Sequence, residues 1–266
     1  MNRLMAVGRL TDRESGAEPE CFQDVMLRAL KGLARHRRSS NRLVRVLFAA
    51  ALLVPLAGAA PAGAIESLDY HWSLRGFLGR LAGVVVPHEG RGQLRSRPVG
   101  QNGQAEGGRI TELEITSAEA GRGEFFRYGG EMRADGTTAQ AWSSYRWRGE
   151  EKSHRDPVAE AGVVDVASGI HLIRERQPTG PLHLRIWSDG KVYPVVVDRL
   201  ATEPVTVPAG NFVADHYRIR GVKAAGQRYW KGGLDLWLAK DQPATPVRIQ
   251  VERGFANVRL ELLPGA

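Results

Sequence analysis

The stretch Leu182–Asp198, LHLRIWSDGKVYPVVVD, decides the fold of this chain. Its first seven residues place an apolar side chain at every second position. Successive side chains of a β-strand point to opposite faces, so this period indicates a strand with one apolar face. Asp189-Gly190 then interrupts the run, and Asp-Gly is a two-residue hairpin signal because Gly accepts positive φ. The stretch therefore predicts an antiparallel hairpin that packs one face on a core.

The same alternation continues toward the C-terminus. Turn signals at Pro208–Asn211, Lys223–Gln227 and Asp241–Pro243 separate the apolar runs. The runs are Val205–Val207, Phe212–Val222, Arg228–Ala239, Val247–Val251 and Val258–Leu262. They predict a meander of five or six strands between residues 182 and 263.

The half of the domain before this meander is less regular. Four segments are expected to be strands: Ser67–Leu74, Thr111–Thr116, Glu124–Arg133 and Ala141–Arg148. Two polar segments, Gln101–Gly108 and Ser153–Glu160, are expected to be loops. The fold class that follows is mainly β, an antiparallel meander that forms a curved sheet, a half-open barrel or a sandwich.

One short helix is expected near 163–176. Val166, Ile170 and Ile173 recur at roughly helical spacing, and Pro178 lies just beyond the end of the segment.

The N-terminal region has the order of an export signal. A basic segment precedes the apolar run Val46–Ala57, and the small residues Ala62 and Ala64 stand just before Ile65. The basic residues are Arg35, Arg37, Arg38, Arg42 and Arg45. We expect cleavage before Ile65 and a periplasmic protein. The alternative is an inner-membrane anchor formed by an uncleaved signal, but the run is short for a span.

These features divide the chain into three parts. Residues 1–25 are expected to be a non-native or disordered extension, residues 26–64 the signal peptide, and residues 65–266 a single β domain. Cys21 is the only cysteine, so the expected mature domain has neither disulfide nor thiol chemistry.

Charge gives little reason to expect a nucleic-acid partner. Residues 1–64 carry ten Lys/Arg and five Asp/Glu, and the remaining residues carry 27 and 24, a net charge of only +3. The histidines after the leader lack ligand spacing, and nucleotide-loop motifs are missing from the sequence. We therefore expect no nucleic acid, no metal and no cofactor, and membrane contact only through the signal peptide.

Five segments of the C-terminal half resemble a known family. They are VASGIHLIR (166–174), WSDGKVY (187–193), VPAGNF (207–212), LWLAKD (236–241) and PVRI (246–249). In this order they resemble the bacterial domain-of-unknown-function family 3108, over about residues 65–263. The resemblance implies an exported envelope protein of a Gram-negative bacterium with an antiparallel β fold. It implies no activity and no catalytic residues.

Candidate ligand-binding residues come from the strand faces and from the arginines. Trp187 and Trp237 stand opposite the leucines of their strands, where each either lines a second apolar surface or makes a surface cross-strand contact. Tyr193, Arg174 and Arg185 complete the set. The two arginines either clamp an anion or pair with carboxylates on a solvated face.

Three functions follow from these observations. The first is a non-enzymatic envelope module that binds an apolar or amphipathic ligand such as lipid. The second is an envelope interaction or assembly factor that works through an exposed strand edge or loop. The third is an unrecognised hydrolase, because sequence cannot reveal catalytic groups that are assembled from distant strands.

Overall fold

A computed structural model describes residues 65–75, 88–99, 108–118, 123–147, 149–240, 244–253 and 256–265. The expectations for residues 1–64, including Ala62 and Ala64, lie outside the described residues. Most of the expected loop 101–108 and the whole break 241–243 also lie outside them.

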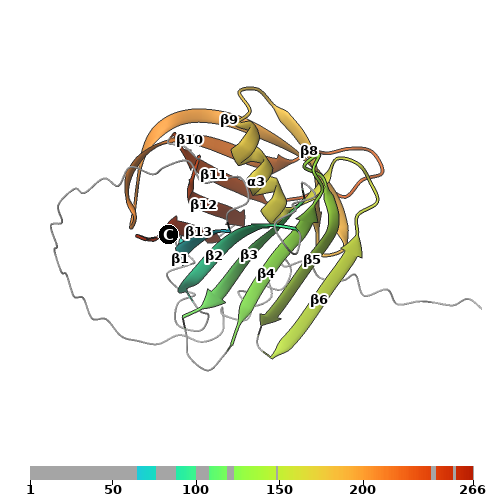
Figure 1. The fold of residues 1–266 in the computed structure, drawn as a ribbon, viewed down its shortest axis with the longest axis horizontal. Coiled ribbons are helices and arrows are strands. Elements are labelled where there is room, and N and C mark those ends of the chain that lie inside the picture. The colour runs from blue at the N-terminus through green and yellow to red at the C-terminus, as the bar shows by residue number, and fades with distance from the viewer. Residues whose placement is uncertain are drawn as a thin grey trace, which may run out of the picture.

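The described chain forms one mixed sheet and one helix (Figure 1). The elements are β1 (Glu66–Arg75), β2 (Glu89–Pro98), β3 (Arg109–Ser117), β4 (Phe125–Met132), β5 (Thr138–Trp147), β6 (Glu150–Pro157), β7 (Val163–Asp165), α3 (Val166–Arg176), β8 (Leu182–Ser188), β9 (Lys191–Val207), β10 (Gly210–Gly221), β11 (Gly233–Ala239), β12 (Pro246–Arg253) and β13 (Ala256–Leu262). The strand order is β6-β5-β4-β3-β2-β1-β13-β12-β11-β10-β9-β8-β7. Only β7 and β8 pair in parallel among these described strands.

The predicted hairpin and the predicted meander are confirmed. Asp189 and Gly190 have φ of 51° and 72° and connect β8 to β9. Two consecutive residues with positive φ suit the right-handed twist of the flanking strands. From β8 to β13, each strand then pairs with the next one along the chain.

Three local expectations were wrong. Of the expected loop Ser153–Glu160, residues 153–157 belong to β6, which pairs with β5 from Glu150 to Pro157, and residues 158–160 alone follow the strand as loop. An edge strand needs no apolar face, and its charges discourage pairing with other chains. The helix begins at Val166 rather than Val163, since residues 163–165 form β7. β11 begins at Gly233, five residues later than expected. In addition, β2 forms at Glu89–Pro98, where no strand was predicted.

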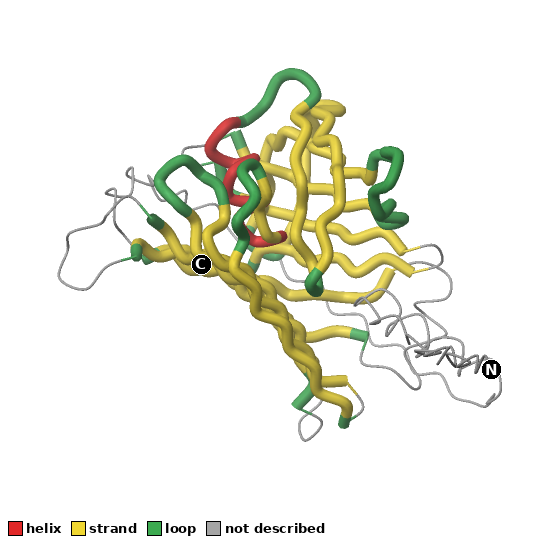
Figure 2. Tube along the Cα trace, turned by 90° about the vertical axis from the view of Figure 1, so that its right-hand side faces the viewer, coloured by secondary structure: helices red, strands yellow, loops and turns green. Residues whose placement is uncertain are grey.

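The sheet curls around α3, and its concave face forms the main core (Figures 1 and 2). The helix packs on β3, β4, β7 and β8. Fully buried side chains of the concave face include Tyr70, Leu236, Ile249 and Leu260. The described strands do not close into a barrel, because β6 and β7 are the two ends of the strand order.

The two edges nevertheless meet through side chains. Trp187 of β8 packs with Ala141, Val158 and Val163 in a second, smaller core. Its indole Nε1 donates a hydrogen bond to Asp156 of β6 over 3.1 Å. Side chains rather than a backbone ladder therefore hold the edges of the curled sheet together.

The long β9–β10 hairpin arches over the C-terminal strands. At its tip, the backbone N–H of Ala209 donates to the carbonyl of Leu262 in β13 over 2.9 Å. Arg248 of β12 donates to the carbonyl of Thr206 over 2.8 Å. The hairpin therefore reaches across β11 and β12 and covers part of their outer face.

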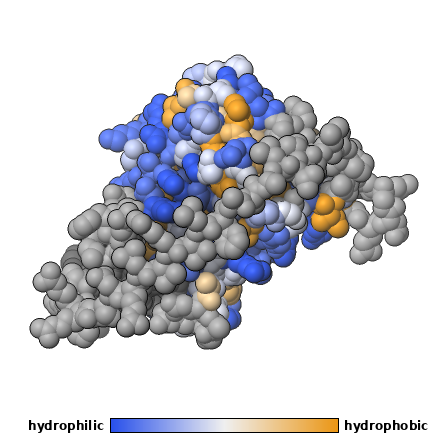
Figure 3. Space-filling view, turned by 90° about the vertical axis from the view of Figure 1, so that its left-hand side faces the viewer, coloured by the Kyte–Doolittle hydropathy of each residue, from blue (hydrophilic) through white to orange (hydrophobic). Residues whose placement is uncertain are grey.

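The outer face of the sheet is polar and rich in ion pairs. Arg127 contacts Glu112 at 3.1 Å and Glu114 at 3.2 Å. Figure 3 shows one side of the molecule, on which small hydrophobic patches are interspersed among polar residues. Among the described residues, no helix has the length and apolar character needed to cross a membrane.

Candidate ligand-binding site beneath helix α3

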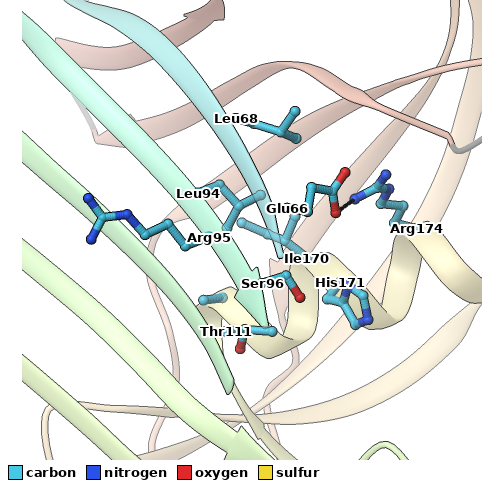
Figure 4. A pocket seen from close by; sticks show the side chains of 10 residues that line it. Glu66, Leu68, Leu94, Arg95, Ser96, Thr111, Ile170, His171 and Arg174 are labelled. Atoms are coloured by element: carbon cyan, nitrogen blue, oxygen red, sulfur yellow. Dashed lines mark hydrogen bonds and ion pairs between the residues drawn. The ribbon is translucent and has the colours of Figure 1, made fainter. Parts of the chain in front are cut away.

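A small pocket lies between α3 and the concave face of β1, β2 and β3 (Figure 4). It is lined by Glu66, Leu68, Leu94, Arg95, Ser96, Thr111, Ala167, Ile170, His171 and Arg174. Its volume of about 10 Å³ has room for about one water molecule. The lining joins the aliphatic side chains of Leu68, Leu94 and Ile170 to Glu66, His171 and Arg174 on one side, whereas the exposed Arg95 side chain points away from them (Figure 4). Apolar walls with a few polar groups are typical of small-molecule sites.

Asp165 fixes the start of α3 against the sheet. Its carboxylate accepts hydrogen bonds from the backbone N–H groups of Ala167 (3.0 Å) and Ser168 (3.1 Å), and so caps the helix. The hydroxyl of Thr138 donates to the same carboxylate over 3.2 Å. Burial raises the pKa of Asp165, although these hydrogen bonds favour the charged form.

Close approach of β4 to the helix start depends on Gly130. A Cβ at this position would lie 1.9 Å from Oδ2 of Asp165. Next to it, the hydroxyls of Thr111 in β3 and Ser168 in α3 lie 2.7 Å apart and are both buried. These contacts anchor the first turn of α3 to the sheet.

An ion pair anchors the last turn of α3. The guanidinium of Arg174 donates to the carboxylate of Glu66 over 2.5 Å, as the dashed line in Figure 4 marks. The Arg174 side chain is only 9% exposed, whereas that of Glu66 is 28% exposed. The pair therefore places one buried and one partly hydrated charge at the side of the pocket.

His171 is the titratable group on the same side of the helix. Its Nε2 lies 2.9 Å from the carboxylate of Glu175, one helical turn later. Burial lowers the pKa of His171, and the nearby charges of Arg109 and Arg174 act in the same direction, while Glu175 opposes them. The imidazole is therefore biased toward its neutral form, which can both donate and accept a hydrogen bond.

Of the five candidate residues from the sequence, Arg174 lines this pocket and the other four lie elsewhere. Trp187 is buried between the sheet edges. Tyr193 is buried on β9, opposite Ile186 of β8. Arg185, 41% exposed, forms an ion pair with Glu160.

Trp237 is buried beneath the β9–β10 hairpin. Its ring stacks on His216, with centroids 4.2 Å apart and planes 16° apart. The guanidinium of Arg248 lies 5.5 Å from the ring centroid, and Nε1 donates to Glu203 over 2.5 Å. The two tryptophans therefore lie in two separate environments rather than on one shared surface.

Four polar residues of the pocket lining were not predicted from the sequence: Glu66, His171, Ser96 and Thr111. The position of His171 three residues before Arg174 was a usable signal, because such residues share one side of a helix. The contact between Glu66 and Arg174 spans 108 residues, so local sequence could not reveal it.

A metal ion would need a cluster of side chains that could bind it. No group of three or more His, Cys, Asp or Glu side chains that could hold a metal ion occurs within the described ranges.

In the part of the chain that the structure describes, the fold is a curled β-sheet covered by one helix, with a small pocket between them. A family model described as "Protein of unknown function (DUF3108)" matches residues 117–263. The chain belongs to this family, as the resemblance predicted. No curated protein matches the chain.

Three solved structures are similar to the chain at low identity. A β-barrel-like protein of domain of unknown function DUF1849 from Brucella abortus has a TM-score of 0.47 and 9% identity, with 74% of this chain and 95% of that chain covered. A putative exported protein with a YmcC-like fold from Bacteroides fragilis has a TM-score of 0.31 and 13% identity, with 74% and 93% covered. The lipoprotein LppX from Mycobacterium tuberculosis has a TM-score of 0.23 and 11% identity, with 74% and 84% covered.

Proposed function

We propose that this chain is an exported, periplasmic envelope protein that binds an apolar or amphipathic ligand of the lipid class, without catalysis, between the concave face of its sheet and α3. The observation that carries the proposal is the amphipathic lining beneath a single helix. Leu68, Leu94 and Ile170 offer apolar contact there, and Glu66 and Arg174 offer a charged end.

The ligand requires α3 to move away from the sheet. A pocket for a drug-sized or larger molecule has about 300–1,000 Å³, whereas this pocket has about 10 Å³. Lifting α3 would expose the apolar concave face, which includes Leu94 and Leu113 of β2 and β3. The described structure is then the closed arrangement, in which α3 lies against the sheet.

The helix is the part of the core best suited to move. The neighbouring strands are joined by backbone ladders, whereas α3 is joined to β1, β3 and β5 by side-chain contacts of Arg174, Ser168 and Asp165. Gly169 in its middle lowers its intrinsic helix stability. Lifting α3 also exposes Ala167, Ile170, Leu172 and Ile173, which are buried in the main core, so burial of the ligand has to offset that loss of apolar contact.

Native mass spectrometry of the full protein, isolated from the cell envelope without detergent, tests the ligand. The proposal predicts a bound species with the mass of a lipid, and binding of a fluorescent fatty acid that competes with it. A protein that carries no lipid and binds no such probe would contradict the proposal. N-terminal sequencing of the same sample tests export, for which we expect the mature chain to begin at Ile65.

An interaction or assembly role remains the second candidate, because among the described strands the backbone of β6 pairs with β5 alone. This strand has β5 on one side, and its residues are mostly exposed. A partner strand that supplies complementary charges could pair there. Co-purification of a stoichiometric envelope protein, lost when Ser153 is replaced by Pro to disrupt the edge, would favour this role over ligand binding.

A further inference from the structure

The loop that joins β10 to β11, residues 222–232, is cationic and carries aromatic side chains. It contains Lys223, Arg228 and Lys231 and no Asp or Glu. All three cations are exposed, and Tyr229 is one of the large hydrophobic residues that remain exposed, at 43%. In Figure 1 the loop projects from the sheet, coloured orange.

Contacts at its base hold the loop in shape. Trp230 is partly buried against the main core, and its carbonyl packs so closely on Gly221 that a Cβ there would lie 2.2 Å from the oxygen. The backbone N–H of Val222 donates to the carbonyl of Pro194 over 2.9 Å. The partly buried Trp230 thus fixes the loop, while Tyr229 and the three cations are exposed.

The charges of the loop differ from those on the outer face of the sheet. There, arginines such as Arg127 and Arg218 contact carboxylates of neighbouring strands. In the loop, Lys223 instead lies over the Tyr229 ring, 5.6 Å from its centroid. A cation held on an aromatic ring keeps its charge available to an anionic surface.

We propose that residues 222–232 dock the protein on an anionic phospholipid surface. Lys223, Arg228 and Lys231 would lie among the lipid phosphates, and Tyr229 would insert at the level of the headgroups, where amphipathic rings are favoured. Each cation near such a surface contributes roughly fivefold in affinity, so the three together contribute roughly a hundredfold. This inference does not depend on the ligand proposed beneath α3.

Flotation of the full protein with vesicles tests the proposal. We expect binding to phosphatidylcholine vesicles that contain phosphatidylglycerol, and little binding to phosphatidylcholine alone. The variant Lys223→Gln/Arg228→Gln/Lys231→Gln should lose roughly a hundredfold in affinity. Tyr229→Ser should weaken binding without changing its dependence on salt.

A matched control removes the same charge from another place. Arg91 and Arg97 are exposed on β2, and Lys152 is exposed on β6. None of the three lines the pocket beneath α3, and their replacement by Gln lowers the net charge equally. This control should bind the anionic vesicles nearly as well as the unchanged protein. Equal losses in the two triple variants, equal binding to both vesicles, or tighter binding to single-stranded DNA than to the anionic vesicles would each overturn the proposal. Circular dichroism of each variant confirms that the sheet is intact.

Discussion

The guanidinium of Arg174 lies 2.5 Å from the carboxylate of Glu66, and this contact joins the last turn of α3 to the first residue of β1, 108 residues earlier. It is the charged end of the proposed site and one of the contacts that hold the helix closed. If α3 moves as proposed, this pair has to separate.

Replacement of Glu66 by Gln should lower the free energy of unfolding by roughly 1–3 kcal/mol, because it leaves the buried guanidinium of Arg174 without its counter-charge. Arg174→Met should lower the free energy of unfolding by less, since the Glu66 carboxylate that it leaves unpaired is partly hydrated. Urea denaturation of both single variants and the double variant measures the coupling, expected at about 1–2 kcal/mol. If the losses of unfolding free energy in the two single variants add up to the loss in the double variant, the pair does not stabilise the closed position of α3.

Asp235 should make stability sensitive to acid. Burial raises the pKa of this carboxyl, but hydrogen bonds from His216 and Arg218 outweigh burial and lower it below the ordinary value of 3.8. Its contribution is therefore present above pH 3.8 and is lost as the pH falls through the lowered pKa. Asp235→Asn should destabilise the fold by roughly 1.5–3 kcal/mol at neutral pH, and the difference should shrink in acid.

Asp198→Asn is the control for this titration. Its partner Arg220 is 59% exposed, so the expected loss is below about 1 kcal/mol. Urea denaturation of both variants at neutral pH and below pH 3.8 measures how the loss of stability depends on pH. An Asp235→Asn deficit that stays constant with pH would contradict the assigned shift.

Gly130→Ala should displace the start of α3, because the new Cβ would meet the Asp165 carboxylate at 1.9 Å. We expect a loss of roughly 1–3 kcal/mol in thermal or urea unfolding. Gly180→Ala is the matched control, since no atom lies within 4 Å of its added Cβ. It should be neutral or stabilising by up to about 1 kcal/mol. Similar effects at both positions would mean that β4 does not approach the helix as described.

Trp187→Ala should loosen the overlap between the sheet edges. The cavity left among Ala141, Val158 and Val163 should cost roughly 3–5 kcal/mol. Hydrogen exchange should show the largest loss of amide protection in β5 and β7, and a smaller loss in β12 near Ile249. A uniform loss across the sheet would indicate that the edges do not open separately.

Alternating apolar residues and turn chemistry were enough to predict the meander. Asp189-Gly190 marks its turn locally, and the backbone there has the positive φ that the dipeptide predicts. β6 escaped prediction because an exposed edge strand carries charges on both faces and has no apolar period. Val163–Asp165 was read as helix because a three-residue strand is too short to show a period of two.

The candidate site was harder to predict because its contacts are distant in sequence. The expected helix and Arg174 point toward the site, but Glu66, Ser96 and Thr111 come from three other strands. The positions of Trp187 and Trp237 were hard to predict for a different reason. A face opposite the leucines looks exposed in sequence, yet the β9–β10 hairpin covers Trp237 and the sheet edge covers Trp187.

A cross-link between α3 and the sheet tests the central claim most directly. The hydroxyls of Thr111 and Ser168 lie 2.7 Å apart, so Thr111→Cys/Ser168→Cys places two sulfurs within disulfide reach. The measurement is the binding of a fluorescent fatty acid by this variant, with Thr111→Cys alone as the control. We predict binding by the reduced double variant and loss of binding on oxidation, restored by reductant. Undiminished binding by the fully oxidised protein would contradict the claim that the ligand enters beneath α3.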